Sequence, residues 1–134
     1  MERRARARRR IGAIVCLAPV LVLALSLAVG IARPRAAFPG LVLVGLALLI
    51  GLLNLWFAFG RRFVHLARGL EPGTYRPSSG LPVVGMILVL LGCAVSFGSP
   101  WTAALGLLAL AIDTGGSPWF LAATWKDESL WAGS

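Results

Sequence analysis

Residue types that build metal centres and acid–base sites are scarce in this chain, which has five Asp and Glu residues, one histidine and two cysteines. The histidine, His65, has no cysteine or carboxylate cluster near it in sequence, so neither a metal site nor a histidine-based catalytic triad is supported. Cys16 and Cys93 both fall inside apolar runs, where we expect buried thiols and not a disulfide or half of a metal site. The sequence also contains no phosphate-cradling glycine motif. We therefore expect no enzymatic activity, no metal and no cofactor.

Charged residues are also few, at 13%, whereas hydrophobic residues make up 58% of the 134 positions. This composition lies far outside that of soluble globular domains and predicts an integral membrane protein. The length accommodates about four crossings of roughly 20 residues each, with short connections. It leaves no room for a separate soluble domain.

Four apolar runs predict an all-α fold, a polytopic four-helix transmembrane bundle within residues 11–125. The predicted membrane-crossing helices are 11–32, 41–59, 81–97 and 101–125. As a helix, the first run would be about 33 Å long, enough to cross the hydrocarbon as an uncleaved anchor. Only the tripeptide GSP separates the third and fourth runs, which predicts a helical hairpin with almost no loop.

Residues 60–80 form the one long polar stretch between the predicted helices. Within it, Phe63, Leu66, Ala67 and Leu70 recur at i, i+3, i+4 and i+7, which predicts a short helix at the membrane interface that continues the second span. The turn residues of EPGTYRPSSG are expected to end this helix.

Arginine provides almost all of the net charge of +8, since the 13 basic residues are twelve arginines and one lysine. The arginines lie mainly in residues 1–10 and in the loop 60–80, so the positive-inside rule places both segments, and with them the tail 126–134, in the cytoplasm. A basic run beside a span more often fixes topology and contacts anionic lipid headgroups than it binds nucleic acid, so we expect no nucleic-acid partner. The bias toward arginine indicates a GC-rich bacterial genome and hence a bacterial inner membrane. The residues expected to contact headgroups are Arg3, Arg4, Arg6, Arg8, Arg9, Arg10, Arg61, Arg62 and Arg68.

The fourth apolar run is interrupted by the sequence DTGGSP at positions 113–118. Residues 101–112 give only about 18 Å of helix, so Asp113 is expected below the membrane surface. Gly115 and Gly116 suit the end of a helix, Ser117 is a good N-cap and Pro118 fits the first helical position, which predicts that the helix stops and restarts. Because unpaired backbone groups are costly in lipid, the break must face protein or water.

Small residues recur at helical spacing on three of the runs and predict faces on which helices approach closely. The predicted stripes are Ala47, Gly51, Asn54 and Ala58 on the second run; Gly85, Val89, Gly92 and Ser96 on the third; and Thr102, Gly106, Ala109 and Asp113 on the fourth. Asn54 and Asp113 both lie roughly 18 to 20 Å from the outer edge, by residue counts from the starts of their spans. We therefore predict that Asn54 hydrogen-bonds the carboxyl of Asp113 or the open backbone around Gly115.

Three interpretations of Asp113 follow from the sequence. In the first, Asp113 caps the interruption by accepting hydrogen bonds from Gly115 or Gly116. In the second, its carboxylate lies within the membrane and either carries a proton or ion or recognises a partner. In the third interpretation, the chain leaves the membrane at Asp113 and residues 118–125 lie on its surface. The triplet Asp113-Thr114-Gly115 also matches the active-site triplet of aspartic proteases. Because those enzymes are β-sheet proteins with paired aspartates, the match is interpreted as coincidence.

We expect a protein that acts through helix packing with membrane-protein partners, as an accessory subunit, an assembly factor or an immunity protein. The bundle is also expected to associate with itself. The alternative is a small oligomeric transporter or channel, in which the broken helix forms a site from Asp113, Asn54, Thr114, Gly115 and Gly116.

Overall fold

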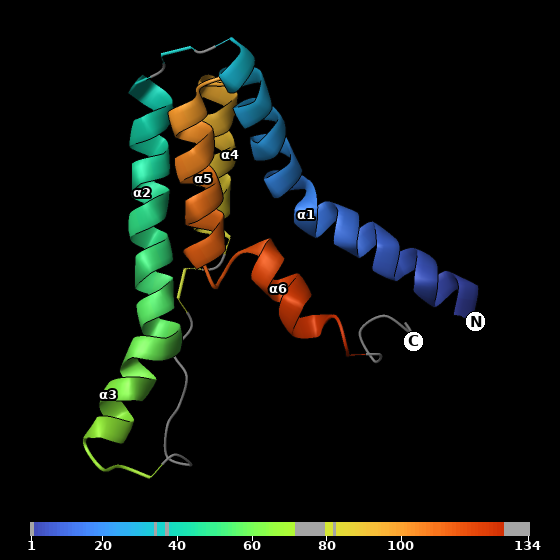
Figure 1. Ribbon diagram of the computed structural model, residues 1–134. Coiled ribbons are helices and arrows are strands. Elements are labelled where there is room, and N and C mark those ends of the chain that lie inside the picture. Colours follow the sequence, from blue (N-terminus) through green and yellow to red (C-terminus); the bar gives the residue numbers. More distant parts are fainter. Residues whose placement is uncertain (1, 34, 37, 72–79, 82, 128–134) are drawn as a thin grey trace.

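The computed structural model of the chain describes residues 2–33, 35–36, 38–71, 80–81 and 83–127, and in these residues the only regular elements are helices. The predicted all-α class is therefore confirmed. The elements are α1 (Glu2–Ala32), α2 (Phe38–Leu55), η1 (Trp56–Gly60), α3 (Arg61–Ala67), α4 (Val84–Val95), α5 (Pro100–Ile112) and α6 (Ser117–Thr124). Figure 1 shows α2, α4, α5 and the second half of α1 side by side as a bundle, from which α3, α6 and the first half of α1 extend.

Within the described residues, three helical segments are long and apolar enough to cross a membrane: Arg6–Ala32, Phe38–Ala67 and Pro100–Thr124. The third apolar run instead forms the 12-residue helix α4, which is shorter than the predicted span 81–97. Val83 precedes α4 in a left-handed conformation, and the chain turns after Val95 through Gly98, whose φ is +83°. At 1.5 Å per residue, α4 is about 18 Å long.

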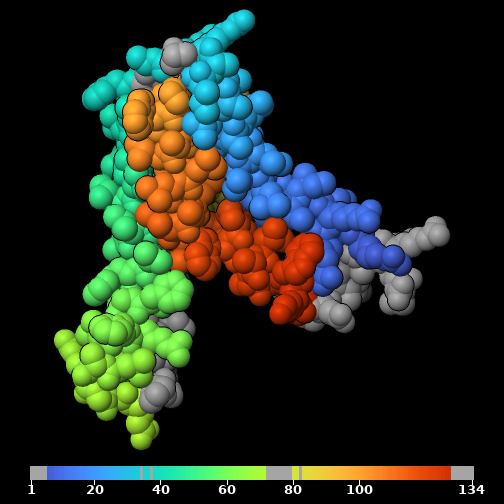
Figure 2. Space-filling view, viewed as in Figure 1, coloured from blue at the N-terminus to red at the C-terminus, as the bar shows by residue number. Residues whose placement is uncertain are grey.

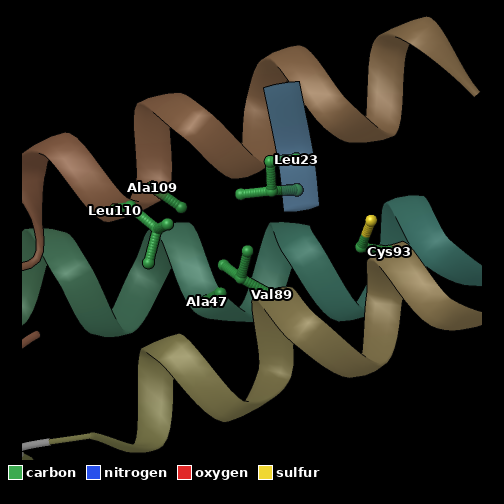
Figure 3. Close-up of a cluster of buried hydrophobic side chains, with 6 residues drawn as sticks. All are labelled: Leu23, Ala47, Val89, Cys93, Ala109 and Leu110. Carbon is green, nitrogen blue, oxygen red and sulfur yellow. The ribbon is translucent and has the colours of Figure 1, made fainter. Parts of the chain in front are cut away.

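A cluster of buried side chains from four helices forms the centre of the bundle (Figure 3). Its members are Leu23, Ala47, Val89, Cys93, Ala109 and Leu110. Small residues allow the helices to approach: a Cβ added at Gly106 would lie 2.8 Å from Leu23 Cδ2, and one added at Gly92 would lie 2.9 Å from Val44 Cγ2. The predicted stripes of small residues therefore lie between helices over most of their length.

Helix α1 changes direction partway along its length (Figure 1), and Pro19 is the proline inside it. Proline has no N–H and its ring displaces the preceding turn, which kinks a helix. Among residues 6–32 of α1, those buried in the bundle all lie from the proline onward: Pro19, Leu23, Ser26 and Gly30. Only the second half of α1 therefore belongs to the bundle.

Helix α2 continues through the π-helical turn η1 into α3 and forms one helical segment, Phe38–Ala67. The ring of Trp56 occupies the space in which Gly60 would carry a Cβ, so a larger residue at position 60 would collide with the indole. The predicted stripe of α2 ends one turn early, because Ala58 is exposed. The wider π turn shifts the register after Leu55, and α5 ends at the level of Asn54, so the prediction for Ala58 is wrong.

Candidate functional site

The helix break between α5 and α6 is closed by hydrogen bonds of Asp113. Its backbone N–H donates to the carbonyl of Ala109 at 2.9 Å, as the last bond of α5, and its own carbonyl accepts from Gly116 N–H at 2.9 Å. Its side-chain Oδ1 accepts from Gly115 N–H at 3.1 Å. Asp113 thus caps the interruption through its side chain and backbone, in the arrangement that favours aspartate in turns.

The new helix begins one residue earlier than expected. Gly116 occupies the N-cap position in extended conformation, α6 starts at Ser117, and no side chain caps its first turn. The Ser117 hydroxyl lies 2.9 Å from the carbonyl oxygen of Cys16 and 3.1 Å from Met86 Sδ, two acceptors for its one proton. Ser117 therefore connects α6 to α1 and α4, and the prediction that it is the N-cap is wrong.

Asn54 joins three segments of the chain at this break. Its Nδ2 donates to Asp113 Oδ1 at 2.6 Å and to the carbonyl of Leu81 at 3.1 Å, and its Oδ1 accepts from Leu81 N–H at 2.8 Å. The side chain uses both amide hydrogens and one oxygen lone pair, and only 3% of Asn54 is exposed. The pairing of Asn54 with Asp113, expected from their equal depths, is present in the structure.

The second carboxylate oxygen of Asp113 is the unusual feature of the site. Asp113 is 1% exposed, and its Oδ2 has no hydrogen-bond partner among the described residues. Gly85 of α4 faces this oxygen, because a Cβ added there would lie 2.5 Å from Oδ2. Burying an acceptor without a partner costs free energy, so Oδ2 is an energetically unfavourable point of the bundle.

The backbone around the carboxyl is also held in place. Val83 N–H donates to the carbonyl of Gly115 at 3.3 Å, which ties the start of α4 to the break. Gly116 is buried, whereas Thr114 and Gly115 are half-buried. The residues predicted around Asp113 and Asn54 are therefore all buried or half-buried at this break.

The other buried polar side chains connect helices near the opposite end of the bundle. Ser96 Oγ accepts from Gly40 N–H at 2.9 Å, and Ser26 Oγ accepts from Gly98 N–H at 3.0 Å. Ser99 caps α5 by accepting from Thr102 N–H at 3.4 Å. These serines fix turns and helix ends.

The remaining predicted residues separate into a buried set and an exposed set. Seven of the predicted packing residues are buried, namely Ala47, Gly51, Gly85, Gly92, Thr102, Gly106 and Ala109. Six of the predicted headgroup arginines are exposed, namely Arg6, Arg8, Arg10, Arg61, Arg62 and Arg68. Arg9 is half-buried, with its guanidinium carbon 5.1 Å from the centroid of a Trp125 ring. Arg3 and Arg4 fall within α1, but their side chains lie outside the described part of the chain.

Cys16 and Cys93 are free thiols; Cys93 is buried as expected, whereas Cys16 is half-buried. Among the described residues, no three His, Cys, Asp or Glu side chains are grouped closely enough to hold a metal ion. Sequence reasoning missed the bonds of Asn54 to Leu81 and of Ser117 to Cys16. No sequence signal pointed to the latter, since the missing N–H of Pro19 leaves unpaired the carbonyl of Val15 and not that of Cys16. No protein-family model, curated protein or solved structure matches this chain significantly.

Proposed function

We propose that this protein is a small polytopic protein of the bacterial inner membrane that acts by packing its helices against other membrane proteins. The observation that carries the proposal is the use of the buried polar groups. The buried side chains of Ser26, Asn54, Ser96, Ser99 and Asp113 all bond to other parts of the same chain. The interior is thus devoted to holding the helices together, and the outer faces are available for partners.

The outer faces of the long helices are strongly apolar. Exposed hydrophobic residues run along α1 and α2, and soluble monomers rarely expose such continuous apolar surfaces. They include Ile11, Ile14, Val15, Leu21, Leu25, Val42, Leu46, Leu49 and Leu52. Lipid tails and the helices of partner proteins can both pack against these apolar faces. Such faces support a role as an accessory subunit, an assembly factor or an immunity protein. A second copy of the chain is also a suitable partner.

Four crossings with both ends in the cytoplasm form part of the proposal. The contact between Arg9 and Trp125 brings the end of α6 beside the start of α1, which supports one side of the membrane for both ends. The basic residues before Ile11 and in α3 support the cytoplasmic side. The short α4 completes its crossing together with the segments on either side of it, and α5 and α6 together form the last crossing.

The second candidate function is transport of a proton or cation by an oligomer. It is favoured by one observation, the buried Oδ2 of Asp113 without a partner beside a broken helix. Ionisable groups in such positions commonly line ion pathways, and broken helices form binding sites in transporters.

Two measurements decide between the candidates. Purification in mild detergent is expected to recover the protein with a larger membrane complex if it acts through partners. Purified protein in liposomes is then expected to give no proton or cation flux, in the wild type or in Asp113→Asn. A flux that the wild type supports and Asp113→Asn abolishes would replace the first proposal with the second.

A further inference from the structure

Two helix discontinuities lie next to each other in space although they are about a hundred residues apart. One is the Pro19 kink in α1, and the other is the break before α6. The Ser117 hydroxyl connects them through the carbonyl of Cys16, which lies in the turn that the proline disrupts. The kink in α1 and the break between α5 and α6 therefore lie at the same level of the molecule.

Beyond this level, residues 6–18 of α1 and helix α6 form a pair, here called the arm. Figure 1 shows both helices leaving the bundle on the same side, and the space-filling view in Figure 2 shows them in contact. The pair is joined near the break by Ser117 and Cys16 and at its far end by Arg9 and Trp125. The two helices thus support each other along their length.

The arm buries few residues against the bundle, and two side-chain hydrogen bonds attach it there: the Ser117 hydroxyl lies 3.1 Å from Met86 Sδ of α4, and Trp119 Nε1 donates to the carbonyl of Ala111 in α5 at 2.8 Å. None of residues 6–18 is buried, and in α6 the one buried residue is Leu121, at 9% exposure. By contrast, α5 contributes five buried residues to the bundle. Segments with few buried apolar contacts open at low free energy, so the arm can move relative to the bundle.

The arm begins directly beside the unsatisfied oxygen of the site. Gly116 precedes α6, and a Cβ added there would lie 3.6 Å from Asp113 Oδ2. If the arm moves away, Ser117 moves with it and the turn at Gly116 opens, so that water reaches Oδ2. The hydrogen bond that Oδ2 then gains offsets part of what is lost, namely the contacts of Leu121 and the bond of Trp119 to Ala111.

We propose that residues 6–18 and α6 swing as one arm about Pro19 and residues 113–116, and that this movement admits water to Asp113. In the closed form, both Leu121 and Asp113 Oδ2 are buried. In the open form, Leu121 is exposed and Oδ2 is accessible to water. Such a hinge gives two states of similar free energy, which a ligand or partner of the arm can bias.

Distances between spin labels in lipid nanodiscs test the movement. Cys16→Ala and Cys93→Ala provide the background, and label pairs are placed at exposed positions: Leu46 with Ala122 (bundle to arm), Arg8 with Ala122 (within the arm), and Leu46 with Leu108 (within the bundle). We expect two distances for the first pair and one distance for each of the others. A single distance for the first pair, or two distances within the arm, would overturn the proposal.

Leu121→Ala shifts the balance, and Phe120→Ala is its matched control because Phe120 is 56% exposed. Leu121→Ala is expected to raise the population of the second distance and to speed amide hydrogen exchange at Gly115 and Gly116 by about tenfold. Phe120→Ala is expected to change neither. Unchanged exchange in Leu121→Ala, or faster exchange throughout α2 and α5, would overturn the proposal.

Discussion

Nδ2 of Asn54 donates to Oδ1 of Asp113 at 2.6 Å, across 59 positions of sequence, and this bond holds the residue at which α5 ends. Through Leu81, the same amide also fixes where the chain enters α4. One polar contact therefore sets the ends of two helices. In hydrocarbon, where no water competes, such a contact specifies register as well as adding stability.

Removal of the acceptor tests this role. Asp113→Leu leaves Asn54 Nδ2 and Gly115 N–H with one partner fewer, so we expect the free energy of unfolding to fall by about 1–3 kcal/mol. Asp113→Asn keeps an oxygen in the same place and is expected to lose about 1 kcal/mol or less. Unfolding by steric trapping in bicelles measures both values, and equal losses would show that the hydrogen bonds to Oδ1 contribute nothing.

Gly85 gives a prediction with a matched control in the same protein. A Cβ at position 85 would lie 2.5 Å from Asp113 Oδ2, whereas a Cβ at Gly45 would meet nothing within 4 Å. Gly85→Ala must displace the carboxyl and is expected to destabilise the fold by about 1–3 kcal/mol. Gly45→Ala is expected to be neutral or to stabilise α2 by up to about 1 kcal/mol. The same unfolding assay compares them, and a neutral Gly85→Ala would mean that the carboxyl moves freely.

Backbone strain before α4 predicts a stabilising change. Val83 has φ +70°, a conformation that a β-branched side chain adopts only at a cost. Val83→Gly removes that cost and is expected to raise the free energy of unfolding by about 1 kcal/mol. Val84→Gly, one residue later in regular helix, is the control and is expected to give no gain. A loss of stability in Val83→Gly would indicate that the side chain contributes more by packing than its conformation costs.

The sequence was sufficient to predict the helices, the break at Asp113 and the partner of its carboxyl. Composition decides the helical class, and the constant rise of a helix makes the depths of Asn54 and Asp113 comparable by counting. The register of Ala58 was predicted wrongly, because a π turn adds a residue to the helical repeat without a distinctive sequence pattern. The contacts of Leu81 and Ser117 depend on where the chain enters or leaves a helix. Tertiary packing determines these positions, and the periodicity of the sequence does not predict them.

Orientation in the membrane gives the last prediction, and it follows from the distribution of arginine. Ala36 lies in the short connection between α1 and α2, and Arg62 lies in α3; both are exposed. If the basic segments stay in the cytoplasm, Ala36→Cys faces the outside of the inner membrane and Arg62→Cys faces the inside. In a Cys16→Ala, Cys93→Ala background, an impermeant maleimide is expected to label Ala36→Cys in spheroplasts. Arg62→Cys should be labelled only after lysis. The reverse pattern would show that the bundle has the opposite orientation, with the basic residues of α1 and α3 outside the cytoplasm.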